Sequence, residues 1–386
     1  MPVAGDSTLA EWLSSQHIAL AFTTYRANRL MFLGVGERGQ LKLHGRLFDR
    51  PMGLFFDGRA LWMVGRRQIW RLDNLLATSA CHQGGDRLYV PAASFLTGDV
   101  NAHEVVIDAG GTLLFVNTAF SCIASLTAGY SFAPTWQPPF LSRLAADDRC
   151  HLNGLALQDG IATWVTACGA TDQSAGWRQD RSTGGVVLHI PSNAIVASGL
   201  AMPHSPRWYD GKLWLLNSGT GELGWIEADR FSPLCFLPGF ARGLAFAGGC
   251  AVVGLSQLRS PQFSGLPLEE RLSAAGIAGG CCGLWVIDLT TGSTLHSLQL
   301  PEPIAELFDV VVLPGVRQPR ALGLQGEEID CLVRWPGCDQ LVTVRPQAPA
   351  ATPNLGDGLR DFGLPAADSS RNSPVNDHPG VGDAPA

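Results

Sequence analysis

Histidines recur along this chain at a spacing that could build one site from distant segments. His103, His151 and His204 each stand at the start of an apolar stretch, roughly 50 residues apart along the chain. Neutral imidazoles with a nearby carboxylate can hold a divalent transition metal such as zinc, manganese or iron. We therefore expect these three histidines to be metal ligands. Polar residues near them are candidate substrate-binding groups, namely Glu104, Asn153 and Ser205.

Four charged residues near equivalent places in the chain are candidates for catalysis. A bound metal with an open coordination position would activate water or polarise a substrate oxygen. Arg50 or Arg242 could clamp a carboxylate or stabilise developing negative charge. Glu306 or Asp309 could serve as a metal ligand or a general base.

Two other interpretations of the same histidines stay open. They could form a ligand site without a metal. They could also be structural, because polar side chains at the rim of a channel bond to loop backbone and to water. His204, which precedes Ser205-Pro206, could simply fix the entry of a strand.

An internal repeat gives these scattered residues a common location. Each repeat has a leading residue, a short apolar strand, a glycine seven positions after the leading residue, and a second apolar strand. Asp-Gly between two such strands is a hairpin signal. The repeats are 51–58, 103–110, 153–160, 204–211 and 242–249, with a looser sixth at 307–315.

Four-stranded units that repeat every 40–60 residues are typical of the blades of a β-propeller. Units begin near residues 50, 101, 151, 201, 240 and 305, so the sequence predicts an all-β protein with six blades. The first strand of each blade lines the central channel. Leading residues of different repeats should therefore meet at one rim of that channel.

The last repeat has too few strands for a blade of its own. We expect segments 17–23, 30–34 and 40–47 to complete it, so that the two ends of the chain close the ring. The alternative is a seventh blade made of residues 17–49. Residues 255–280 should form a lobe on the fifth blade, with a helix over 267–275 that begins at a proline.

Composition limits the class of protein and its partners. The net charge of −7 and the absence of a basic stripe argue against nucleic acid. No apolar run reaches membrane-spanning length, and residues 1–16 read as a short leader without signal-peptide character. Ten cysteines without a CxxC pair indicate a reduced, cytoplasmic protein, although the vicinal Cys281-Cys282 could be a soft metal or redox site. We expect a propeller over 17–345 and a disordered tail over 346–386, where Pro, Ala and Asp abound.

Several stretches resemble a bacterial family of conserved hypothetical proteins that carry a domain of unknown function. The stretch that runs from Met202-Pro-His-Ser-Pro to Leu223 is the most specific of them. The others are 101–104, 150–156, 239–245 and 254–259, and the resemblance spans roughly 15–325. It implies a family without a settled activity.

The chain is also similar in fold to six-bladed propellers of the gluconolactonase, strictosidine-synthase and NHL groups. The gluconolactonase type holds its metal mainly with carboxylates and asparagine, whereas the corresponding places in this chain are rich in histidine, so lactonase activity does not carry over. A histidine-based zinc site more closely resembles the amidating-lyase propellers. Such likeness of fold is weak ground for function.

These observations lead to two hypotheses of function. The first is a metal-assisted lyase or hydrolase that acts on a small or peptide-like substrate at the His103, His151 and His204 rim. The second is a non-catalytic propeller that binds a peptide or protein partner in a biosynthetic pathway.

Overall fold

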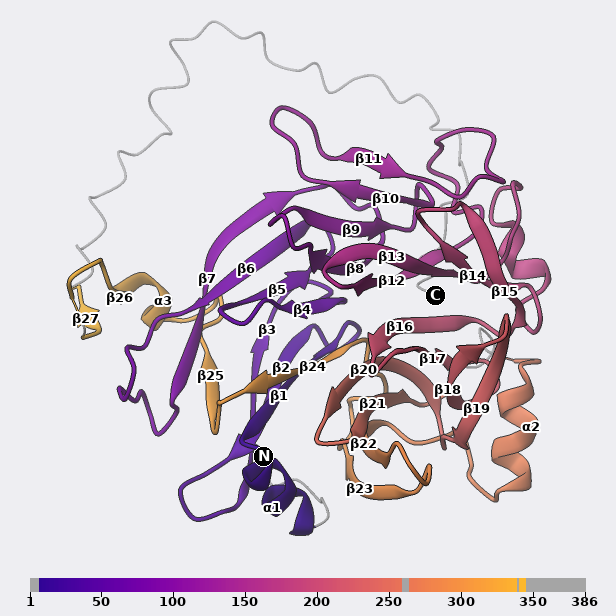
Figure 1. Cartoon of the computed structure of the whole chain (residues 1–386). Helices are drawn as coiled ribbons and strands as arrows, with labels where there is room; N and C mark the ends of the chain where they lie inside the picture. Colours follow the sequence, from indigo (N-terminus) through magenta and orange to yellow (C-terminus); the bar gives the residue numbers. More distant parts are fainter. Residues whose placement is uncertain (1–6, 259–263, 339, 345–386) are drawn as a thin grey trace, which may run out of the picture.

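The computed structural model describes residues 7–258, 264–338 and 340–344, and these residues form a six-bladed β-propeller (Figure 1). Each blade is a sheet of four antiparallel strands, as predicted. Three α-helices are the main other elements of the described residues: α1 (Ser7–Ser15), α2 (Pro267–Ala274) and α3 (Glu327–Cys331).

Blades 1 to 3 are built from consecutive strands that follow one another from the channel outward. Blade 1 contains β4 (Leu54–Phe56), β5 (Ala60–Val64), β6 (Gln68–Asn74) and β7 (Arg87–Leu96). Blade 2 contains β8 (Ala102–Ile107), β9 (Leu113–Asn117), β10 (Cys122–Ser125) and β11 (Ala133–Trp136). Blade 3 contains β12 (Leu152–Gln158), β13 (Ile161–Ala167), β14 (Gly185–His189) and β15 (Ala194–Leu200).

Blades 4 and 5 repeat this order, and blade 6 joins the two ends of the fold. Blade 4 contains β16 (Pro203–Tyr209), β17 (Lys212–Asn217), β18 (Glu222–Glu227) and β19 (Arg230–Phe236). Blade 5 contains β20 (Phe240–Ala247), β21 (Cys250–Ser256), β22 (Gly283–Asp288) and β23 (Thr294–Gln299). Blade 6 contains β24 (Val310–Pro314), β1 (Ile18–Thr24), β2 (Arg29–Val35) and β3 (Leu41–Leu47).

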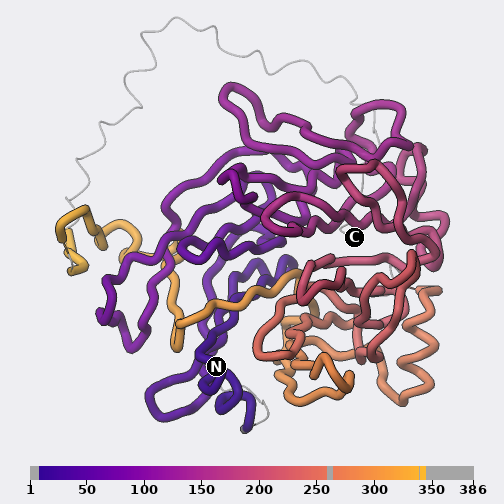
Figure 2. Tube along the Cα trace, viewed as in Figure 1, coloured from indigo at the N-terminus to yellow at the C-terminus, as the bar shows by residue number. Residues whose placement is uncertain are grey.

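The ring closes as the sequence predicts. Strand β24 is the inner strand of blade 6 and pairs antiparallel with β1, with Leu20 opposite Val312. In Figure 2 the orange segment that carries β24 runs beside the indigo N-terminal strands. The seventh-blade alternative is therefore wrong, because β1, β2 and β3 share a sheet with β24.

Tight turns connect the first two strands of a blade where the sequence has Asp-Gly, the expected hairpin signal. Both central residues of the β16–β17 turn have positive φ, 49° at Asp210 and 72° at Gly211, and the β12–β13 turn repeats this at Asp159 and Gly160. Positive φ at both positions matches the right-handed twist of the flanking strands. Each glycine thus sets the register of the strand that lines the channel.

Apolar side chains between blades form the core. Trp164 of blade 3 stacks on Trp208 of blade 4 with ring centroids 6.2 Å apart, a contact that packs the two blades together. Helix α1 also belongs to the core, because Leu9 and Leu13 are buried against blades 5 and 6. Residues 7–15 of the expected leader therefore contribute to the folded domain.

Some segments lie outside the blades. Strand β25 (Pro319–Ala321) adds parallel to β7, and α3, β26 (Leu332–Val333) and β27 (Val342–Thr343) follow it. Helix α2 lies in the expected lobe. The predicted disordered tail falls outside the described residues. All ten cysteines are free, and no helix of the described residues is long and apolar enough to cross a membrane.

Candidate functional site

The inner strands of blades 2 to 5 are irregular where the candidate site residues occur. Their pairing shifts register between Ala102 and Val105, between Leu152 and Gly154, between His204 and Arg207, and between Arg242 and Leu244. Such bulges re-aim side chains and are frequent beside active sites. Four blades thus depart from regular pairing at the same end of the channel.

His103 and His204 are held by the same arrangement in blades 2 and 4. The residue two positions earlier, Asn101 or Met202, has a φ of 48°. Its carbonyl oxygen lies 2.8 Å from Nδ1 of the imidazole in both cases. The left-handed backbone, uncommon for Met, turns that carbonyl toward the ring.

A hydroxyl group completes each arrangement and ties it to the next blade. Thr118 Oγ1 lies 2.8 Å from His103 Nδ1 and donates to the Leu152 carbonyl at 2.6 Å. Ser218 Oγ lies 3.1 Å from His204 Nδ1 and donates to the carbonyl of Ala241 at 2.7 Å. Two further hydroxyls bridge from the second strand of a blade to the start of the next inner strand, those of Thr23 and Ser256.

These partners assign the proton of each ring. A carbonyl oxygen can only accept, so Nδ1 of His103 and of His204 carries the hydrogen and Nε2 presents a lone pair. Burial lowers the pKa of both rings well below the ordinary value, and the charge of Arg242 acts in the same direction. Both imidazoles are therefore neutral.

His151 has a different partner, the carboxylate of Asp148. Its Nδ1 lies 3.0 Å from both carboxylate oxygens. Trp177 Nε1 donates to the same carboxylate at 3.0 Å, and the Trp177 ring lies against the imidazole with centroids 4.3 Å apart. Trp177 comes from a short 3₁₀-helix (Gly176–Gln179) between β13 and β14. A carboxylate behind Nδ1 is the arrangement that orients a general base.

Arg242 of blade 5 is a buried cation between two aromatic rings. Its Cζ lies 5.3 Å from the ring centroid of Phe240 and 5.2 Å from that of Phe308. Its side chain is among the largest that are fully buried. None of its three guanidinium nitrogens has a hydrogen-bond partner in the part of the chain that the structure describes. An unpaired buried charge is costly, and the guanidinium retains donors that could pair with an anion.

Ring contacts join these residues into one group. The His103 ring forms T-shaped contacts with His151 and Phe308, with centroids 4.9 and 5.3 Å apart, and the His204 ring does so with Phe240 at 5.6 Å. Nε2 of each of the three histidines lacks a hydrogen-bond partner among the described residues, as the guanidinium of Arg242 does. We call His103, His151, His204 and Arg242 the histidine–arginine cluster.

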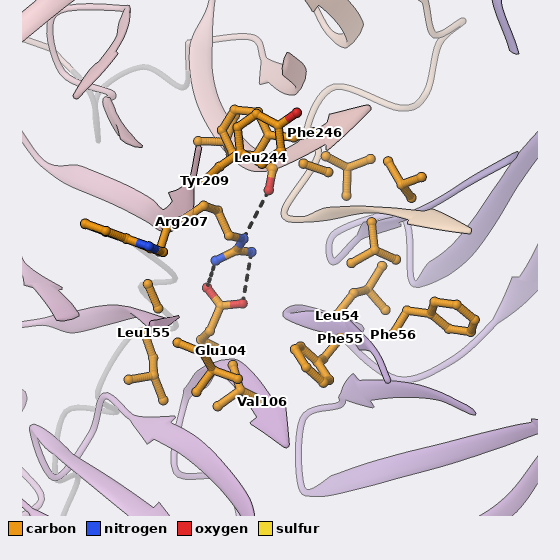
Figure 3. A pocket seen from close by; sticks show the side chains of 17 residues that line it. Leu54, Phe55, Phe56, Glu104, Val106, Leu155, Arg207, Tyr209, Leu244 and Phe246 are labelled. Carbon is orange, nitrogen blue, oxygen red and sulfur yellow. Dashed lines mark hydrogen bonds and ion pairs between the residues drawn. The ribbon is translucent and has the colours of Figure 1, made fainter. Parts of the chain in front are cut away.

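An ion cluster with two buried carboxylates and a partly exposed arginine crosses the channel further along the inner strands (Figure 3). Arg207 of blade 4 donates to both carboxylate oxygens of Glu104 of blade 2, at 3.0 and 3.2 Å, and lies 3.3 Å from Asp309 just before β24. Burial raises the pKa of Glu104 to about 8, and Asp309 adds to this while Arg207 opposes it. The pKa of Asp309 is also raised by burial.

Beyond the ion cluster the channel holds an apolar pocket. Its volume is about 330 Å³, and Glu104 and Arg207 form part of its wall. Figure 3 shows aromatic side chains around it, among them Phe55, Phe56 and Phe246. The channel therefore has a polar end and an apolar portion, with ion pairs between them.

The other predicted site residues are engaged within the protein. Arg50 bonds the side chain of Asn101 and lies 3.7 Å from Asp99. Glu306 accepts a hydrogen bond from the backbone N–H of Arg26 at 2.7 Å. Asn153 accepts from Thr166 at 2.7 Å and lies 3.3 Å from the sulfur of Cys168, and Ser205 accepts from the backbone N–H of Gly243 at 2.9 Å. The structure does not place these residues in the histidine–arginine cluster.

The cluster fits a metal ion only in part. A histidine that binds a metal commonly donates its other ring hydrogen to a carbonyl or carboxylate, and all three histidines do so in this protein. Among the described residues, however, no three His, Cys, Asp or Glu side chains are grouped so that they could hold a metal ion. The unpaired Arg242 beside the imidazoles also disfavours a second cation.

Several residues that contact the histidine–arginine cluster were not predicted from the sequence. Phe308 stands seven positions before Gly315, so the repeat itself would have placed it. Thr118 and Ser218 each follow an asparagine that ends the second strand of a blade, which is a repeated signal. Asp148 and Trp177 have no such signal, because their contacts depend on loop geometry.

Comparison with solved structures gives distant likenesses. One is a chain of a nidogen/laminin complex, with 13% identity, 77% of this chain and 98% of that chain covered, and a TM-score of 0.48. Another is a gluconolactonase from Xanthomonas campestris, with 12% identity, 75% and 86% covered, and a TM-score of 0.43. Virginiamycin B lyase from Staphylococcus aureus has 13% identity, 61% and 73% covered, and a TM-score of 0.38.

Sequence comparison identifies the family of this chain but does not supply an activity. No curated protein matches this chain. A family model described as a domain of unknown function (DUF4915) matches residues 7–322, which include every blade and the whole histidine–arginine cluster. The chain therefore belongs to the DUF4915 family.

Proposed function

We propose that the chain is a lyase or hydrolase that binds a small anionic molecule in the histidine–arginine cluster. One observation carries this proposal. Four buried side chains from four consecutive blades present nitrogen atoms that have no partner in the described part of the chain. Buried polar groups are almost always satisfied, so such a group marks a place for a ligand.

The residues can be assigned roles from their contacts. Arg242 binds the anionic group of the substrate and stabilises negative charge that develops beside it. His151 is the general base, because Asp148 holds the hydrogen on Nδ1 and leaves Nε2 free to take a proton. Asp148 and Trp177 are positioning residues, since they act through the imidazole.

The test compares how far wild type and His151→Gln, which lacks the proposed general base, consume a substrate. The full chain is incubated with a small-molecule cell extract, and mass spectrometry compares the compounds before and after. We expect a few anionic compounds to be consumed by wild type and by His189→Gln, a half-buried control outside the cluster, but not by His151→Gln. Equal consumption by wild type and His151→Gln, or none by wild type, would overturn the proposal.

The same preparation tests for the metal that the sequence analysis considered. Elemental analysis of protein purified without added metal should find less than one equivalent of zinc, manganese or iron. If the protein contains one full equivalent of metal and His103→Gln loses it, these histidines form a metal site and the proposal of a metal-free general base is wrong.

The apolar pocket favours a second candidate function, binding of a peptide or protein partner. Its aromatic walls, with Tyr209 stacked on Phe246 at 4.2 Å, could hold an apolar side chain of that partner. In that case Phe246→Ala should weaken binding of the partner. It should leave unchanged the consumption of extract compounds, which depends on His151. Loss of both activities together would count against a separate partner site.

A further inference from the structure

The pattern of hydrogens in the histidine–arginine cluster restricts the kind of anion that fits. This step rests on the proposed function and concerns only the substrate class. His103 and His204 both donate their Nδ1 hydrogen to a backbone carbonyl, at 2.8 Å in each case. Their Nε2 atoms can therefore only accept a hydrogen bond while the rings are neutral.

The surroundings keep both rings neutral. Each side chain is almost fully buried, and the fixed charge of Arg242 lies close to both. A proton added to either ring would place a second positive charge beside that guanidinium in a buried site. Among the described residues, the two imidazoles thus retain lone pairs and Arg242 retains hydrogens that have no partner.

From this geometry we infer that the substrate is a small hydroxy acid, a molecule with one carboxylate and at least two hydroxyl groups. The carboxylate pairs with the planar guanidinium of Arg242, which has free donors. Two hydroxyl groups donate to Nε2 of His103 and of His204. Every unpartnered group of the cluster other than the base, His151, then has a complementary partner.

Other ligand classes leave a conflict in the same site. A dicarboxylate or a phosphate monoester would bring a second anionic group against the imidazole lone pairs. An amino acid could donate through its ammonium group, but it would add a cation beside Arg242, whose guanidinium nitrogens have no partner among the described residues. A neutral polyol satisfies the histidines and leaves Arg242 unpaired.

Three six-carbon probes separate these classes: D-gluconate, adipate and sorbitol. Isothermal titration calorimetry of the full chain should show D-gluconate binding at least tenfold more tightly than adipate or sorbitol. Titrations in buffers of different ionisation enthalpy should show that binding takes up no proton. Removing one buried acceptor in His204→Phe should weaken D-gluconate binding by about tenfold and leave adipate unchanged, whereas His189→Phe should change neither.

Each alternative result contradicts the inference in a recognisable way. Adipate binding as tightly as D-gluconate, or uptake of one proton per D-gluconate, would mean that charged imidazoles bind a second anionic group. No binding of D-gluconate at about 10 mM would also overturn the hydroxy acid assignment. All these results leave the proposed function standing if His151→Gln still abolishes depletion of extract compounds, so the two failures are distinguishable.

Discussion

The imidazole rings of His103 and His151 meet edge to face, with centroids 4.9 Å apart and planes at 88°. They come from neighbouring blades and have unlike supports, a backbone carbonyl behind His103 and the Asp148 carboxylate behind His151. A carboxylate can stabilise an imidazolium that forms during a reaction, and a carbonyl does so less. One ring of the pair is therefore suited to take a proton and the other to accept a hydrogen bond.

Nitrogen NMR of the histidine side chains tests this division directly. We expect His103 and His204 to carry their hydrogen on Nδ1 in the unliganded protein and to remain neutral at pH 6. The reason is that Nδ1 faces a carbonyl oxygen in both and that burial lowers the pKa of both rings. Spectra of His103→Gln and His204→Gln assign the signals. A hydrogen on Nε2 in either ring would contradict the arrangement.

Arg242, which is buried, and Arg207, which is partly exposed, should respond oppositely to the same substitution. In Arg242→Met the free energy of unfolding should stay unchanged or rise by about 1 kcal/mol, because an unpaired buried charge is removed. In Arg207→Met it should fall by about 3–5 kcal/mol, because Glu104 and Asp309 lose their shared partner. Urea denaturation measures both. A large loss of stability in Arg242→Met would mean that its contacts with Phe240 and Phe308 outweigh its missing partner.

How far the sequence predicted this site depends on which contacts repeat. His103, His204 and Arg242 share a repeat position, so their convergence followed from the propeller alone. Asp148 could not be found in this way, because it meets His151 through a loop. Glu104, Arg207 and Asp309 come from alternate blades and meet across the channel. Arg207 lies further from the leading residue of its repeat than Glu104 does from its own. The bulges in β8 and β16 account for this difference, and the sequence pattern did not predict them.

Stability should fall as pH rises through the range in which Glu104 titrates. Its pKa is raised from 4.5 to about 8 in the folded chain, chiefly by burial. Between these values the folded state keeps the proton that the unfolded state has lost, so unfolding becomes easier with each pH unit. The effect is complete above pH 8 and absent below pH 4.5, and it amounts to a few kcal/mol at most.

The variant Glu104→Gln isolates that contribution. The free energy of unfolding of wild type relative to Glu104→Gln should decrease between pH 5 and pH 8, measured by urea denaturation at each pH. Glu11→Gln, at an exposed position of α1, serves as the control and should follow wild type. A wild-type curve parallel to that of Glu104→Gln would show that Arg207 keeps the carboxylate ionised.

The hydroxyl of Thr118 has two tasks, and one substitution should reveal both. It accepts from His103 and donates to the Leu152 carbonyl of the next blade at 2.6 Å. In Thr118→Val the carbonyl is left buried without this donor, so the free energy of unfolding should drop by about 1–3 kcal/mol. Thr163→Val removes a less buried hydroxyl whose hydrogen bond, among the described residues, goes to the Ile161 carbonyl of its own strand, and it should cost less. The His103 signals should shift in Thr118→Val alone; equal losses and unshifted signals would mean that the hydroxyl only fills space between blades 2 and 3.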